Sequence, residues 1–109
     1  CLRREELLSG CVVLTGEFRL PLESLGEARE AMARVINASR AEPGCIAYSY
    51  GEDVLEPGLF RVSEVWTSEE ALQAHFRQPH MDRWREERDR LGMFDKRMTN
   101  HAVSKSTQF

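Results

Sequence analysis

Apolar and polar residues alternate along three segments of the chain, and a period of two predicts β-strands with one buried face. These segments are residues 11–20, 45–52 and 59–66. A weaker alternation predicts a fourth strand over residues 97–105. Residues 53–58 carry turn-forming Asp, Pro and Gly, so they are expected to close a hairpin between the second and third strands.

Between the first two strands the period changes to that of an α-helix. The positions that follow the helical period and share one face are Leu25, Ala28, Met32, Val35, Ile36 and Ser39. Ser24 is the predicted N-cap, and Glu27 is its partner in a capping box. The helix is about 16 residues long. It is expected to end before Glu42-Pro43-Gly44, because proline cannot continue a helix and glycine permits a positive φ.

Two more helices are predicted between the third and fourth strands. Thr67 and Glu70 form the capping box of the first. Pro79 begins the second, since the first turn of a helix does not use its N–H groups, and Gly92 ends it. The residues expected on one face of this last helix are Met81, Trp84, Arg88 and Leu91.

The order β-α-β-β-α(α)-β is that of a split β-α-β motif, which builds an α+β fold with a four-stranded antiparallel sheet and helices on one face. We expect one domain over residues 11–105, a flexible lead-in over residues 1–10 and a loose tail over residues 106–109. The second face of the sheet needs a cover, and another copy of the chain is the simplest one.

The composition of the chain limits the classes of partner that we expect. The chain has 109 residues, 41% hydrophobic and 30% charged, with a formal net charge of -3 and no basic run, so nucleic acid is not an expected partner. No apolar run is long enough to span a membrane, and no signal peptide is evident. Three widely spaced cysteines, Cys1, Cys11 and Cys45, then favour a reduced, cytoplasmic protein.

Candidate chemistry gathers where the third strand meets the next helix, at Trp66, His75, Phe76 and His80. His75 follows Leu72 by three residues, so it points toward the apolar face of its helix and the sheet. An imidazole in such a pocket can accept or donate a proton near neutral pH. The alternative is a buried histidine that is satisfied by a backbone carbonyl.

Glu64 lies between Val62 and Trp66 on an otherwise apolar strand face, where an ionised carboxylate needs a partner. Arg19 or one of the histidines is a candidate partner; Glu64 either orients His75, acts as a base or forms a structural ion pair. Tyr48 either donates a hydrogen bond to a ligand or fills the core, as does Tyr50, and both are expected to share a face with Ile46.

A metal site is not predicted. His75 and His80 are five residues apart with a proline between them, which fits no standard pair of helical ligands. No cluster of Asp, Glu and His residues completes a ligand set, and no glycine-rich phosphate loop is present.

Three segments resemble the antibiotic biosynthesis monooxygenase (ABM) family: EPGCIAYSY at 42–50, VSEVWTSEEALQAHF at 62–76 and QPHM at 78–81. The resemblance covers residues 11–105 and implies a ferredoxin-like fold that pairs into a dimeric α/β barrel. It also implies a pocket between the sheet and the helices of each protomer. The strand-end tryptophan of the family falls on Trp66, and its helix histidine, aromatic neighbour and second histidine fall on His75, Phe76 and His80.

The resemblance implies a monooxygenase that needs no cofactor and oxidises an electron-rich aromatic such as a quinol or polycyclic phenol with O2. His75 would be the base, assisted by Glu64; Trp66, Phe76, His80, Tyr48 and Met81 would bind the substrate. The alternatives are a non-catalytic dimeric module that binds a small ligand, and an isomerase of a small carbonyl compound. Haem-degrading relatives carry an asparagine where this chain has Phe18, and the anion site of a sugar-phosphate isomerase is not evident.

Overall fold

The computed structural model of the chain describes residues 10–109, so Cys1 and most of the predicted lead-in lie outside the described residues. In chain order the elements are β1 (Val12–Arg19), a 3-10 turn (Leu22–Ser24), α2 (Leu25–Arg40), β2 (Cys45–Glu52), β3 (Leu59–Trp66), α3 (Glu69–Phe76), α4 (Pro79–Leu91) and β4 (Phe94–Ala102). This is the predicted β-α-β-β-α(α)-β order, and the α+β, ferredoxin-like fold is confirmed.

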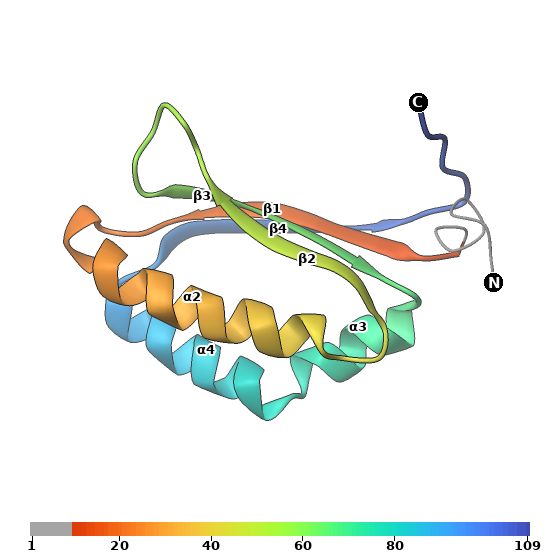
Figure 1. The fold of residues 1–109 in the computed structure, drawn as a ribbon, viewed down its shortest axis with the longest axis horizontal. Helices are drawn as coiled ribbons and strands as arrows, with labels where there is room; N and C mark the ends of the chain where they lie inside the picture. The colour runs from red at the N-terminus through yellow and green to blue at the C-terminus, as the bar shows by residue number, and fades with distance from the viewer. Residues whose placement is uncertain (1–9) are drawn as a thin grey trace.

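The four strands form one antiparallel sheet in the order β2-β3-β1-β4. The three helices cover one face of this sheet, as Figure 1 shows; we call it the helix face, and the opposite one the outer face. Antiparallel strands with one packed face explain why the sequence alternates with a period of two. In the register of β1 and β3, Leu14 lies opposite Glu64 and Phe18 opposite Phe60.

The last strand begins three residues earlier than the sequence pattern predicts, at Phe94 rather than at residue 97, and it ends at Ala102. Gly92 adopts a left-handed conformation that ends α4, so the chain turns back toward the sheet at once. A register shift between Glu17 and Arg19 then lets β4 pair with β1 as far as Arg19. Irregular pairing of this kind hides the alternation in the first residues of β4.

Neither predicted capping box forms. The Ser24 hydroxyl donates to the Leu91 carbonyl at 2.7 Å and makes no cap for α2. At the start of α3 the cap is Ser68 instead of Thr67, and its hydroxyl accepts from the Ala71 N–H at 3.1 Å. Ser68 has the extended backbone conformation of an N-cap.

We expect Ser68→Ala to lower the free energy of unfolding by about 1 kcal/mol, because one N–H of the first turn of α3 loses its acceptor. Thr67→Ala is the matched control and should change stability by less than about half of that. Chemical denaturation of both variants measures the difference. A larger effect at Thr67 would contradict the cap assignment.

The core lies between the helix face of the sheet and the helices, in two adjoining clusters. The first contains Phe18, Met32, Val35, Phe60, Val62, Met81, Trp84 and Leu91 among others. The second contains Val12, Leu14, Tyr48, Trp66 and Leu72. Ile46 does not share a face with Tyr48 as predicted, because β2 shifts register between Cys45 and Ala47 and leaves Ile46 39% exposed.

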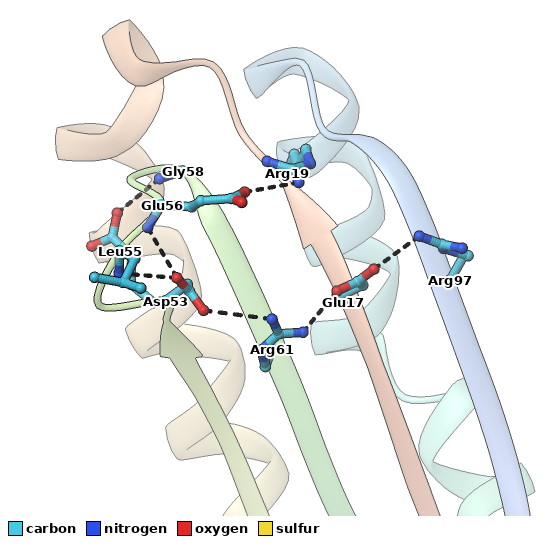
Figure 2. A network of polar contacts seen from close by, with 9 residues as sticks. Glu17, Arg19, Asp53, Leu55, Glu56, Gly58, Arg61 and Arg97 are labelled. Atoms are coloured by element: carbon cyan, nitrogen blue, oxygen red, sulfur yellow. Dashed lines mark hydrogen bonds and ion pairs between the residues drawn. The ribbon is translucent and has the colours of Figure 1, made fainter.

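The outer face carries a row of ion pairs toward one end (Figure 2). Glu17 lies between two arginines, 2.8 Å from Arg61 Nη1 and 3.0 Å from Arg97 Nη2. On the same side Arg19 pairs with Glu56 at 2.9 Å, so it is not the partner of Glu64 that the sequence offered. Exposed ion pairs like these add little to the free energy of unfolding. The stability of the sheet therefore comes mainly from the core that packs on its helix face.

Within residues 10–109, every helix is too short or too polar to cross a bilayer.

Candidate functional site

A cavity of about 130 Å³ lies between the sheet and the helices. Its wall is largely apolar and aromatic, with a few polar groups among them. The lining residues are Leu14, Phe18, Tyr48, Tyr50, Val62, Glu64, His75, Phe76, Met81, Trp84, Arg88, Met93, Lys96 and Met98. A small apolar cavity with a few converging polar groups is the usual form of a ligand site.

His75 is the most buried polar group of the wall, with 0% of its surface exposed. Its Nδ1 lies 2.7 Å from Glu42 Oε2. Its ring contacts those of Trp66 and Tyr48, with centroids 4.5 and 5.4 Å away. The second ring nitrogen, Nε2, is buried and has no hydrogen-bond partner among the described residues. A buried nitrogen without a partner is a costly feature, and a ligand in the cavity would satisfy it.

The turn before β2 brings Glu42 to His75. Backbone hydrogen bonds from the Glu42 N–H to the Ser39 carbonyl and from the Thr67 N–H to the Gly44 carbonyl fix this turn against the start of α3. A Cβ on Gly44 would come within 2.4 Å of the Ala71 Cβ, so only glycine permits the close approach. The short turn therefore places the Glu42 carboxylate beside a helix that lies 33 residues further along the chain.

The surroundings of His75 favour its neutral form. Burial lowers its pKa below the ordinary value, and the hydrogen bond to Glu42 offsets only part of this effect. A carboxylate accepts hydrogen bonds, so Nδ1 carries the proton and donates it to Glu42. Nε2 then carries a lone pair without a hydrogen-bond partner among the described residues, which is the state that a general base requires.

Glu64 is the second titratable group of the wall and is only 4% exposed. Its Oε1 accepts a hydrogen bond from the Trp66 indole N–H at 3.0 Å and lies 3.9 Å from His75 Nε2. Burial raises the pKa of Glu64 to about 7, although the Trp66 hydrogen bond lowers it in part. Near neutral pH the carboxyl group therefore exchanges a proton easily, beside the free nitrogen of His75.

Two tyrosines from β2 add further polar groups to the wall. The hydroxyl groups of Tyr48 and Tyr50 lie 2.8 Å apart and share one hydrogen bond. Burial raises the pKa of both phenols, so both remain protonated. Because one hydroxyl proton is used within the pair, the other is available to an oxygen atom of a ligand.

The structure brings most of the predicted site together around one cavity. His75, Glu64, Tyr48, Phe76 and Met81 all line it. Two other predicted substrate contacts do not line it: Trp66 is fully buried and donates its indole N–H to Glu64, and His80 binds the same oxygen of Glu42 as His75 does. Their placement favours a supporting role for both residues.

The prediction that no Asp, Glu and His cluster forms around the two histidines is wrong. Glu42 Oε2 accepts from His80 Nε2 at 2.8 Å as well as from His75, and donor atoms of all three residues lie within 4.8 Å of one another. Two imidazoles and a carboxylate are a ligand set that a divalent ion such as Zn²⁺ can use. The two hydrogen bonds to one oxygen account for the arrangement by themselves, because they satisfy all three groups.

Three residues of the site were missed in the sequence. Glu42 was read only as part of a turn, Arg88 only as a member of a helix face, and Lys96 lay outside the predicted strand. Arg88 carried a signal, since a charged residue in the spacing of Met81, Trp84 and Leu91 faces the core side of α4. Nothing near Glu42 in sequence marks it as a histidine partner.

We expect Glu42→Gln to loosen the tautomer of His75, whose Nδ1 lies 2.7 Å from Glu42 Oε2. An amide can donate as well as accept, so it no longer holds the proton on Nδ1 of His75. Imidazole ¹⁵N NMR of the wild type should show the Nδ1–H tautomer, and the variant should show a mixture. An unchanged spectrum would contradict the role of Glu42.

The fold and this site together define a small α+β protein with a buried, oriented histidine on an apolar cavity. The family model of antibiotic biosynthesis monooxygenases matches residues 11–87, and the chain belongs to this family. An uncharacterized protein of Synechocystis, sll1783, is 36% identical over 69 residues, which are 63% of this chain. The match spans 47% of that relative, so this chain corresponds to about half of its length.

Solved structures share the fold. A candidate antibiotic biosynthesis monooxygenase of Deinococcus radiodurans superposes with a TM-score of 0.84 at 23% identity, over 90% of this chain and 97% of that one. Rv0793 from Mycobacterium tuberculosis has a TM-score of 0.80 at 23% identity, over 90% and 99%. At this level of identity the likeness establishes the fold alone.

Proposed function

We propose that the protein is a monooxygenase that needs neither metal nor flavin and oxidises a phenol or quinol with O2. One observation carries the proposal: His75 lines an apolar cavity, its buried Nε2 has no hydrogen-bond partner among the described residues, and its Nδ1 is held by Glu42. This arrangement supplies the one group that such a reaction needs from the protein, a positioned base in a dry pocket.

The chemistry begins with the removal of a phenolic proton by His75 Nε2. The imidazolium that forms keeps its hydrogen bond to the Glu42 carboxylate, which stabilises the new charge. The electron-rich anion passes one electron to O2, and the two radicals combine to a hydroperoxide with a new C–O bond. His75 returns its one proton to the peroxide; loss of the ring C–H proton at the oxygenated carbon then cleaves the O–O bond, and one quinol and one O2 give a hydroxyquinone and one water. The substrate supplies all the electrons.

The volume of the cavity limits the size of the substrate. An apolar protein cavity of about 150 Å³ binds benzene, so about 130 Å³ fits a single aromatic ring. A polycyclic phenol would have to extend through the mouth of the cavity or displace its side chains. A sugar-like substrate of an isomerase fits this cavity less well than an aromatic ring does. The methionine and aromatic side chains of the wall would leave the hydroxyl groups of the sugar without hydrogen-bond partners.

The test is O2 consumption with methylhydroquinone and with a reduced naphthoquinol, each with protein, with protein plus chelator, and without protein. We expect uptake well above autoxidation, no effect of the chelator, and one ¹⁸O atom per product molecule when ¹⁸O₂ is used. Uptake that the chelator removes would move the chemistry to a metal held by Glu42, His75 and His80. Binding of quinols with uptake equal to the blank would favour the small-ligand-binding module.

We also propose that the protein acts as a homodimer through the outer face of its sheet. In support, the outer face has no cover within the described chain (Figure 1). Beyond the ion pairs it carries small or apolar side chains such as Val13 and Ala47, which both lie opposite Val65 in the strand register. Light scattering after gel filtration should give twice the mass of one chain. Ala47→Arg is expected to shift the equilibrium toward one chain, and a dimer that withstands this change would place the interface elsewhere.

A further inference from the structure

Two positive side chains lie in the cavity wall without an acidic partner. Arg88 comes from the core-facing side of α4, and Lys96 comes from the helix face of β4. Neither forms an ion pair or a side-chain hydrogen bond with any residue of the described chain. Both are less buried than His75 and Glu64, so the positive charge lies on the solvent side of the cavity.

The other arginines of α4 show that Arg88 is an exception. Arg90 pairs with Glu27 at 2.9 Å, Arg85 with Asp82 at 3.1 Å and Arg83 with Glu87 at 3.5 Å. In a chain with 18 acidic and 15 basic residues, acidic partners are abundant. Arg88 and Lys96 therefore lack a counterion because of where they lie in the fold, and not because the chain is short of acidic residues.

Arg88 and Lys96 also disfavour each other. Partial burial lowers the pKa of Lys96, and the positive charge of Arg88 lowers it further. Two like charges beside an apolar wall raise the free energy of the empty site, and an anion between them removes that repulsion. A guanidinium group matches the two oxygens of a carboxylate, and an ammonium group adds a further donor.

We propose that Arg88 and Lys96 form an anion subsite at the solvent side of the cavity, and that the ligand is a single aromatic ring bearing a carboxylate. The ring fills the apolar part, its hydroxyl group reaches His75, and the carboxylate meets the two cations. This inference rests on the proposed function for the hydroxyl end of the ligand only. The anion site that the sequence did not reveal is thus supplied by α4 and β4 together.

Binding measurements under argon test the subsite without any turnover. The ligands are 2,5-dihydroxybenzoate, its methyl ester and methylhydroquinone, followed by isothermal titration calorimetry. We expect the carboxylate to bind at least 10-fold more tightly than its ester, with a preference that weakens as salt is added. Arg88→Gln and Lys96→Gln should each reduce this preference to about 3-fold or less, while affinity for the ester stays the same.

Arg90→Gln is the matched control, because it removes an exposed arginine of the same helix and should keep the full preference. An ester that binds as tightly as the acid, or an acid that does not bind at millimolar concentration, overturns the subsite. Displacement of the acid by inorganic phosphate at equal concentration would also overturn it, since the subsite would then be a phosphate site. A carboxylate preference without O2 uptake supports the subsite and contradicts the proposed oxygenase reaction. O2 uptake without a carboxylate preference supports the reaction and contradicts the subsite.

Discussion

His75→Phe should reduce O2 uptake with a quinol by about 10²- to 10⁴-fold, the usual contribution of a general base. The phenylalanine ring fills the space between Trp66 and Tyr48 but offers no lone pair to the substrate. Glu42 keeps its hydrogen bond from His80, so its charge stays paired in the variant. Oxygen-electrode rates at pH 7.5, with autoxidation subtracted, measure the effect.

His101→Phe is the matched control, because His101 is exposed on β4 and, within residues 10–109, its ring nitrogen bonds only to Thr15. It should retain full turnover. Circular dichroism and thermal melting of both variants check the fold, and quinol binding should persist in His75→Phe, because the apolar wall is intact. A His75→Phe variant with wild-type rates would remove the histidine from the mechanism and with it the proposed reaction.

Glu64→Gln should stabilise the folded protein at pH 8, by up to about 3 kcal/mol. A pKa raised from its ordinary 4.5 to about 7 corresponds to that much free energy, at about 1.4 kcal/mol for each pH unit. The glutamine oxygen still accepts the Trp66 indole N–H, so the only intended change is the loss of a buried negative charge.

The pH dependence follows from the sign of the shift. A group whose pKa is higher in the folded state favours folding most below its unfolded pKa, and the benefit is lost as pH rises through about 7. The gain of Glu64→Gln should therefore be small at pH 4.5 to 5 and complete at pH 8. Denaturant melts at both values measure it, with the exposed Glu30→Gln as the control. Equal effects at both pH values would show that Glu64 is ionised and paired throughout.

His75 acts in the opposite direction. Its pKa is lowered by burial, so it favours folding above its ordinary pKa of 6.5 and opposes folding as pH falls below that value. The two groups lie 3.9 Å apart and disfavour their charged forms for the same reason, removal from water. Near pH 7 the site thus holds a neutral imidazole beside a carboxyl group that is about half protonated, so a proton can be taken from or given to a substrate.

The fold followed from short-range patterns. A period of two over residues 45–52 and 59–66 gave the two strands with their observed bounds, because one face of each packs on the core and the other does not. Pro79 and Gly92 marked the ends of α4 through their own backbone preferences. Capping was decided differently: Ser24 met the Leu91 carbonyl, a contact across 67 residues that no local motif describes.

The features of the site also separate into those set by local sequence and those set by packing. By itself the sequence determined that His75 faces the core and that Glu64 stands on an apolar strand face, because helical and strand periods set both directions. Only the tertiary structure decided that Glu42 meets His75 and His80, and that Arg88 and Lys96 line the same cavity. Each of the contacts to Glu42, like the meeting of α4 with β4, depends on packing between elements. Local periodicity specifies the direction of a side chain, and packing alone specifies its partner.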